Sequence, residues 1–130
     1  MAINGRCKGK HGELEACAVL RDLFGWVARR SQQFCGRGGT DDIQVAQTPG
    51  LFWEVKRVEQ LNVHKSLRKA ASDAGRRCPV LLHRRNRSEW LLTIRLIDLP
   101  RLSHAYQSAS DDSVATPPLP NAHPGDSQSH

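Results

Sequence analysis

An acidic residue and a lysine stand two positions apart in the segment Leu51–Lys56, at Glu54 and Lys56. The rest of the segment is apolar and turn residues precede it, so the pattern predicts a short β-strand. Residues two apart share one face of a strand, so both charged side chains project together while Trp53 and Val55 point the opposite way. A carboxylate and an amine are then held side by side on rigid backbone.

A second carboxylate, at Asp42, precedes the apolar-alternating segment Ile43–Val45. If that strand pairs with the strand of Glu54, the two carboxylates lie next to each other. Mg²⁺ is commonly bound by one or two carboxylates together with substrate phosphate, and the carbonyl of Val55 is a further candidate ligand. A bound cation polarises a phosphoryl oxygen and activates water, while Lys56 can orient that water or stabilise the growing charge. The set predicts hydrolysis of a phosphodiester with Mg²⁺, or with Mn²⁺ as an alternative.

Several of these features also have structural interpretations. Acid-x-lysine pairs in strands are commonly ion pairs that contribute only about 0.2–1 kcal/mol. Glu13 falls in the first turn of a predicted helix, where a carboxylate complements the helix N-terminus; the functional interpretation is a third acid directed at the cation. The glycine-rich loop at residues 31–40, which contains Arg37, either contacts phosphate or connects two strands.

The elements that must position these side chains follow from apolar periodicity and turn residues. Helices are expected over residues 12–24, where Gly25 ends the pattern, and over residues 61–75. Strands are expected at residues 26–31, 42–46, 51–56, 79–83 and 90–96, followed by a short closing helix or turn at residues 98–102. The nearly continuous apolar character of residues 79–83 indicates a central strand covered on both faces. Strands interleaved with helices predict an α/β layer architecture around a central mixed sheet of about five strands.

The charge is unevenly distributed along the chain. Residues 1–105 hold all nineteen Lys and Arg residues against ten acids, a net charge of +9, whereas residues 106–130 hold three acids and no Lys or Arg. Residues 106–130 also contain four of the seven prolines and few large apolar side chains, so a disordered tail is expected there. The folded domain is then residues 1–105. Its basic character is typical of a polyanion-binding surface, although a solvated surface without a partner accounts for the charge about as well.

The cysteines and the apolar runs bear on the cellular setting. No C-x-x-C spacing occurs among the four cysteines, so a zinc ribbon is not expected. The N-terminus lacks the apolar region of a signal peptide, and no apolar run is long enough to span a bilayer. We therefore expect reduced thiols, no membrane association and a cytoplasmic location.

Four motifs in order resemble the PD-(D/E)xK nuclease superfamily. Gly9-Lys10-His11-Gly12-Glu13 matches the G-x-x-x-E pattern of a first helix, and Arg30-Ser31 follows it. Asp41-Asp42-Ile43 supplies the acid before a hydrophobic residue, and Glu54-Val55-Lys56 is the E-x-K motif. The set is most similar to the archaeal-type Holliday junction resolvases and the phage endonucleases related to them, over about residues 5 to 100.

The resemblance implies a restriction-endonuclease-like core and a Mg²⁺-dependent endonuclease that cuts DNA, in particular branched DNA, as a homodimer in a bacterial or phage-infected cell. Asp42, rather than Asp41, would be the principal metal ligand. Glu54 would be the second ligand and Lys56 the catalytic lysine, with Glu13 as the helix carboxylate near the metal.

Two positions depart from the family pattern. Thr40 stands where the pattern has a proline, which leaves open whether Asp41 or Asp42 binds the metal. Lys69 stands where many relatives carry a Gln in the helix after E-x-K. The DNA contacts are expected from one serine and a set of basic residues: Arg30, Ser31, Arg37, Lys65, Lys69, Arg84, Arg85 and Arg87.

Two other functions compete with this interpretation. A nuclease scaffold without turnover would bind nucleic acid and not cleave it; the presence of every expected catalytic residue type argues against it. A small interaction protein would use its basic surface for an acidic protein partner, and its affinity would be indifferent to competing DNA.

Overall fold

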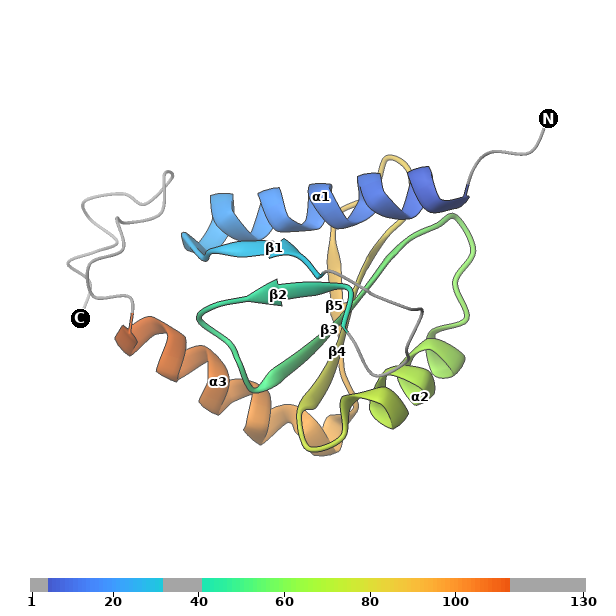
Figure 1. Ribbon diagram of the computed structural model, residues 1–130. Helices are drawn as coiled ribbons and strands as arrows, with labels where there is room; N and C mark the ends of the chain where they lie inside the picture. Colours follow the sequence, from blue (N-terminus) through green and yellow to red (C-terminus); the bar gives the residue numbers. More distant parts are fainter. Residues whose placement is uncertain (1–4, 32–40, 113–130) are drawn as a thin grey trace.

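The computed structural model describes residues 5–31 and 41–112 (Figure 1). The elements are α1 (Gly5–Phe24), β1 (Ala28–Arg30), β2 (Ile43–Val45), β3 (Leu51–Arg57), α2 (Val63–Ala74), β4 (Cys78–Arg84), β5 (Leu91–Thr93), the 3₁₀-helix η1 (Leu96–Asp98) and α3 (Leu99–Asp112).

The strands form one mixed sheet in the order β1-β2-β3-β4-β5, so neighbours in the chain are neighbours in the sheet. Every adjacent pair is antiparallel except β3 and β4, which are parallel and joined through α2. The predicted α/β architecture, a central mixed sheet of five strands flanked by helices, is confirmed, and so is the order of the elements. None of the described helices combines the length and the apolar character that crossing a bilayer requires.

Helix α1 begins at Gly5, ahead of the start predicted at residue 12. The sequence before residue 12 has no apolar stripe, but a formed helix extends cheaply because each added residue gains one hydrogen bond. Gly25 ends the helix as expected: it has φ 73, and its N–H donates to the carbonyl of Arg21 at 2.8 Å. Glu13 consequently lies roughly two turns inside the helix, and the expectation that it occupies the first turn is wrong.

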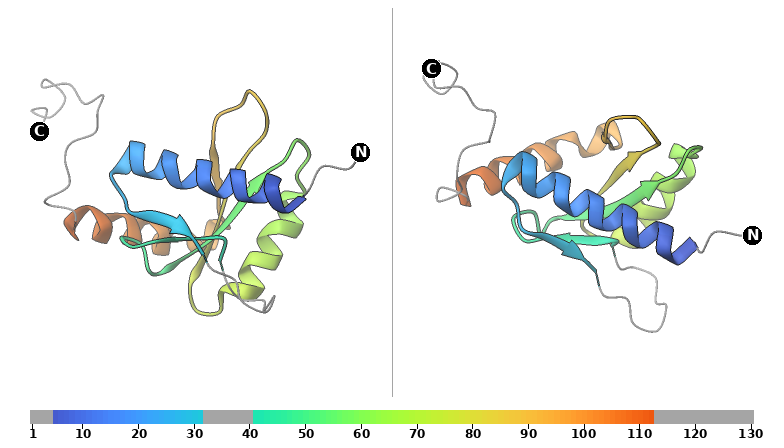
Figure 2. Two further views of the ribbon diagram at one scale, coloured as in Figure 1. Left: turned by 45° about the horizontal axis from the view of Figure 1, so that its top comes forward. Right: turned by 90° about the horizontal axis from the view of Figure 1, so that it is seen from above.

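Strands β3 and β4 form the centre of the sheet. They pair from Leu51 opposite Cys78 to Arg57 opposite Arg84, and the first five residues of each strand are buried. This burial confirms the central strand predicted at residues 79–83. Because the two strands are parallel, their C-terminal ends reach the same edge of the sheet, and the segments that follow them project there beside α1 (Figure 2).

Alternate residues of β3 enter different environments. Trp53 and Val55 join the main core, which residues of α1 and α3 complete. Phe52 packs instead with buried alanines of α2. Glu54 and Lys56 share the face of Phe52 and so point toward the α2 side. The period-2 pattern therefore separates the charged pair from the main core, as predicted.

The C-terminal elements differ from the prediction in length. The expected strand at residues 90–96 is confined to Leu91–Thr93, because η1 follows it and Arg95 pairs there with Asp98 at 2.7 Å between Nε and Oδ2. The closing helix expected at residues 98–102 is α3, which continues to Asp112.

The domain boundary expected at residue 105 is thus too early. Ala109 is fully buried in the main core, and the ring of Tyr106 meets those of Phe24 and Trp26 with centroids 6.1 and 6.0 Å apart. This packing makes the segment up to Asp112 part of the fold, although its composition resembles that of the tail. The remainder of the expected tail, residues 113–130, lies outside the described residues.

Candidate active site

Asp42 lies directly before β2 and is held by the backbone of β3. The pairing of the two strands sets Ile43 opposite Trp53, and the N–H of Asp42 donates to the carbonyl of Trp53 at 2.8 Å. The carboxylate of Asp42 accepts from the N–H of Val55, with 2.8 Å between Oδ2 and N. The pairing expected between these two strands is present, and it brings the side chain of Asp42 onto β3 next to Glu54.

Glu54 and Lys56 form an ion pair with 3.6 Å between Oε2 and Nζ. The side chain of Glu54 is only 6% exposed, whereas that of Lys56 is 37% exposed. A carboxylate this deeply buried is unfavourable unless positive charge compensates it. Lys56 supplies that charge and still reaches solvent, which is the position required of a group that meets an incoming substrate.

The charged side chains border one hollow of about 460 Å³, which we call the acidic cavity. Asp42, Glu54 and Lys56 line it together with Glu13 of α1 and Lys69 of α2. Residues from two helices, one central strand and the residue before β2 therefore meet at one place. The two carboxylates and the lysine that the sequence singles out share this space.

The electrostatics of the acidic cavity favour added positive charge. Burial, followed by the negative charge of Glu54, raises the pKa of Asp42 to about 7. Glu13 adds a smaller upward effect on the pKa of Asp42, while the N–H of Val55 and the amine of Lys56 act in the opposite direction. A carboxyl whose pKa is raised by burial and by a neighbouring carboxylate is typical of sites that bind a cation or handle protons.

Lys69 borders the acidic cavity, whereas the sequence assigns it to the DNA-binding surface. The negative charge of Glu54 is the largest cause of the raised pKa of Lys69, which burial opposes and Asp73 reinforces. Its Nζ lies 3.4 Å from Oδ2 of Asp73, one turn away on α2. The sequence offered a signal for this placement, since Lys69 stands at the position of the helix after E-x-K where the pattern of the resemblance has a Gln.

Glu13 reaches the acidic cavity as half of an ion pair. Its Oε1 accepts from Nε of Arg30 at 2.8 Å. Arg30 and Glu13 are thus brought together, and the guanidinium already compensates the carboxylate. The third metal ligand that the resemblance implies therefore lines the acidic cavity with one carboxylate oxygen bound to a guanidinium.

The neighbouring aspartates enter different surroundings. Asp41 is 2% exposed and accepts from the Ser31 hydroxyl at 3.3 Å and from Nη1 of Arg77 at 3.1 Å. Asp42 alone of the two faces Glu54, as the resemblance implies. Ser31 is itself buried and its hydroxyl is used inside the protein, so the DNA contact expected from Ser31 does not fit this structure.

The donor atoms at the acidic cavity suit a hard divalent cation. The N–H and carbonyl of one strand residue point to the same side, so the carbonyl of Val55 faces the side on which Asp42 lies. Within the described residues, no three His, Cys, Asp or Glu side chains group into a metal-binding set. Mg²⁺ retains waters beside one or two carboxylates, which is the number that Asp42 and Glu54 supply.

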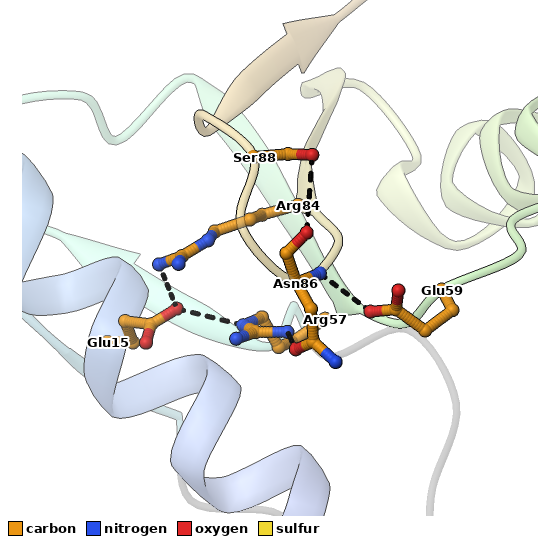
Figure 3. A network of polar contacts seen from close by, with 6 residues as sticks. All are labelled: Glu15, Arg57, Glu59, Arg84, Asn86 and Ser88. Atoms are coloured by element: carbon orange, nitrogen blue, oxygen red, sulfur yellow. Dashed lines mark hydrogen bonds and ion pairs between the residues drawn. The ribbon is translucent and has the colours of Figure 1, made fainter.

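Three of the remaining basic residues assigned to DNA lie in the turn Arg84–Ser88, which we call the basic turn. Arg84 is partly buried and pairs with Glu15 at 3.0 Å (Figure 3). Arg85 and Arg87 are exposed, as is Lys65 in the first turn of α2. Arg37 and the glycine-rich loop lie outside the described residues.

The comparisons with known proteins are sparse. No family model matches the sequence, and no curated protein matches it. Among solved structures, the chain is similar to Archaeoglobus fulgidus Hjc, a Holliday junction resolvase from an archaeal hyperthermophile. The TM-score is 0.49 at 17% sequence identity, and the match covers 65% of this chain and 75% of that chain.

Proposed function

We propose that this protein is a divalent-cation-dependent endonuclease that hydrolyses phosphodiester bonds in DNA. The observation that carries the proposal is the acidic cavity, where Asp42, Glu54 and Lys56 meet although they come from separate parts of the sequence. Charge of both signs is concentrated there in side chains that contribute little to the apolar core. The order of motifs along the chain supports the same function.

Four residues of the acidic cavity have a role in the proposed reaction. Asp42, Glu54 and the carbonyl of Val55 would hold Mg²⁺ or Mn²⁺. The cation, when bound, supplies Lewis-acid polarisation of a phosphoryl oxygen and a more acidic water. Lys56, paired with Glu54 at 3.6 Å, stabilises the negative charge that grows on the phosphoryl group.

The basic surface would bind the phosphates that flank the cleaved bond. Arg85 and Arg87 are exposed in the basic turn, and Lys65 is exposed in the first turn of α2. Such contacts hold the nucleic-acid backbone and read little sequence, which is compatible with selection of branched DNA by shape. We extend the proposal to a homodimer that cuts two strands of a four-way junction symmetrically.

The test is cleavage of linear duplex, flap and four-way-junction DNA by the purified full chain, with Mg²⁺ or Mn²⁺ and with EDTA. We expect cleavage only in the presence of the cation. Asp42→Asn, Glu54→Gln and Lys56→Ala should each lower the rate by about 100-fold or more. Symmetric nicks confined to the junction would establish the proposed substrate class.

Asp22→Asn is the matched control, because Asp22 is an exposed acid of α1 that does not line the acidic cavity. It should cleave like the wild type. Circular dichroism must show that all the variants fold. Normal cleavage by the three cavity variants would refute the assignment of the site.

A nuclease scaffold that binds DNA without turnover is the second candidate. The ion pair of Glu13 with Arg30 at 2.8 Å favours it, because the guanidinium offsets negative charge that would otherwise attract a cation. That protein would bind the same three DNA substrates and cleave none of them with any divalent cation.

A further inference from the structure

The basic turn is tied to the segment that follows β3. The backbone N–H of Asn86 donates to the carboxylate of Glu59 at 2.6 Å, and the side-chain oxygen of Asn86 accepts from Nη1 of Arg57 at 2.8 Å (Figure 3). The hydroxyl of Ser88 donates to the carbonyl of Asn86 at 3.4 Å. The backbone and the side chain of Asn86 are both fixed by partners from outside the turn.

Glu15 of α1 holds the base of the same turn. One of its oxygens accepts from Nε of Arg57 and from Nη1 of Arg84, both at 3.0 Å. Arg57 also lines the acidic cavity and an adjoining hollow of about 210 Å³, to which Asn86 contributes. A path along the surface from the acidic cavity to the basic turn therefore passes Arg57.

The tip of the basic turn has an unusual backbone for its residue type. Arg87 has φ 59, in the left-handed region that glycine and asparagine favour. Strained backbone persists where surrounding contacts determine it, and here the N–H of Ser88 donates to the carbonyl of Arg85 at 3.2 Å beside the bonds of Asn86. Arg85 and Arg87 are both exposed on this fixed support.

We propose that Glu59 and Glu15 are positioning residues for nucleic acid. They hold the basic turn so that Arg85 and Arg87 contact the phosphate backbone of the strand that runs from the acidic cavity past Arg57. The inference rests on the proposed function, because it takes the polyanion that the acidic cavity cleaves as the partner of the turn. Both acids act through the turn and touch no phosphate themselves.

If the two acids acted only through their charge, their removal would strengthen DNA binding, whereas a positioning role predicts that it weakens binding. Removal of an acid from a polyanion-binding surface weakens repulsion and tightens binding. Glu89 is exposed in the same β4–β5 connection and takes no part in the network of Figure 3, so it should follow that rule. Loss of the hydrogen bond between Glu59 and Asn86 instead makes the turn mobile. The arginines then lose conformational entropy when DNA binds, which weakens the affinity.

The test measures the affinity of the full chain for a fluorescein-labelled four-way junction and a linear duplex. Fluorescence anisotropy in EDTA separates binding from cleavage. We expect Glu59→Ala to raise Kd by about 3- to 10-fold and to reduce the slope of log Kd against log salt concentration by about 1. The matched control Glu89→Ala should bind as tightly as the wild type or more tightly.

A third variant distinguishes the hydrogen bond from the charge. Glu59→Gln removes the charge and keeps an oxygen that can accept from the N–H of Asn86, so it should restore wild-type affinity or exceed it. Glu15→Ala should weaken binding in the same direction as Glu59→Ala, with thermal unfolding recorded for both to verify folding. Tighter binding by Glu59→Ala, or equal weakening by Glu59→Gln, overturns the inference.

The two proposals fail in different ways. If the wild type binds no DNA in EDTA and cuts none with Mg²⁺, both are wrong. If the wild type cuts DNA while Glu59→Ala and Glu89→Ala change Kd alike, the nuclease assignment stands and the positioning role is wrong. If the wild type binds without cutting and the Glu59 variants behave as expected, the positioning role stands for a binding protein.

Discussion

Asp42 links the stability of the cation-free protein to pH. Its pKa is raised from 3.8 to about 7, first by burial and then by the charge of Glu54. Between these two values the folded protein retains a proton that the unfolded chain has released. The stabilisation from this proton is therefore fully present below a pH of about 4 and is lost as the pH rises to about 7, at about 1.4 kcal/mol per unit of pKa difference.

Asp42→Asn should remove this dependence, because asparagine is neutral and keeps an oxygen that can accept from the N–H of Val55. In EDTA we expect the variant to exceed the wild type in free energy of unfolding by about 1–3 kcal/mol at pH 8, and to match it closely near pH 4. Urea unfolding at the two pH values measures this. A difference of the same size at both pH values would show that Asp42 is not the titrating group. The control Asp22→Asn should stay within about 0.5 kcal/mol of the wild type at both pH values.

At the level of single residues, the sequence predicts what depends on strand periodicity and misses what depends on tertiary neighbours. The shared face of Glu54 and Lys56 follows from the two-residue repeat of a strand. The separation of Asp41 from Asp42 requires knowledge of Ser31 and Arg77, which approach from elsewhere in the chain. No local pattern could indicate that partner set.

Helix α1 packs tightly against β3 at Gly12. A Cβ at this position would lie 2.7 Å from Cβ of Arg57, too close for either atom to stay in place. The contact is with Cβ of Arg57, which is fixed to the backbone, so rotation of the flexible end of the side chain cannot relieve it. Gly12 therefore sets the separation of helix and strand, and with it the reach of Glu13 and Glu15.

Gly12→Ala should lower the free energy of unfolding by about 1–3 kcal/mol, because overpacking outweighs the gain in helix propensity. Gly9→Ala is the matched control in the same helix. No atom lies within 4 Å of a Cβ built at Gly9, so that change should stabilise the protein by about 0.5–1 kcal/mol. Chemical denaturation measures the free energy of unfolding of both variants. Stabilisation by Gly12→Ala would contradict the close contact between Gly12 and Arg57.

The type and order of the elements could be predicted from the sequence, but several of their ends could not. Apolar periodicity identifies α2 and the buried strand β4 because tertiary packing follows that pattern. The start of α1 and the length of α3 lack such a signal. In α3 the one described residue that is fully buried is Ala109, a small side chain that contributes little to a hydrophobic pattern.

The whole domain extends through α3, and truncation tests this. A chain that ends at residue 112 retains Tyr106 and the fully buried Ala109, whereas a chain that ends at residue 105 loses both. We expect the shorter chain to be less stable by about 2–4 kcal/mol, since an aromatic contact and core burial are lost together. Thermal unfolding of the two truncated chains measures this, and equal melting temperatures would return the domain boundary to residue 105.

The parallel register of β3 and β4 has a consequence for how the protein can change. Lys56 stands opposite His83, and Arg57 opposite Arg84. The lysine on β3 and the start of the basic turn on β4 therefore reach the same end of the sheet on adjacent strands. Lengthening or shortening the connection between β4 and β5 would alter the reach of the arginines and leave the carboxylates where they are. In the proposed nuclease, substrate preference is therefore separable from the hydrolytic step, because each depends on a different segment of the chain.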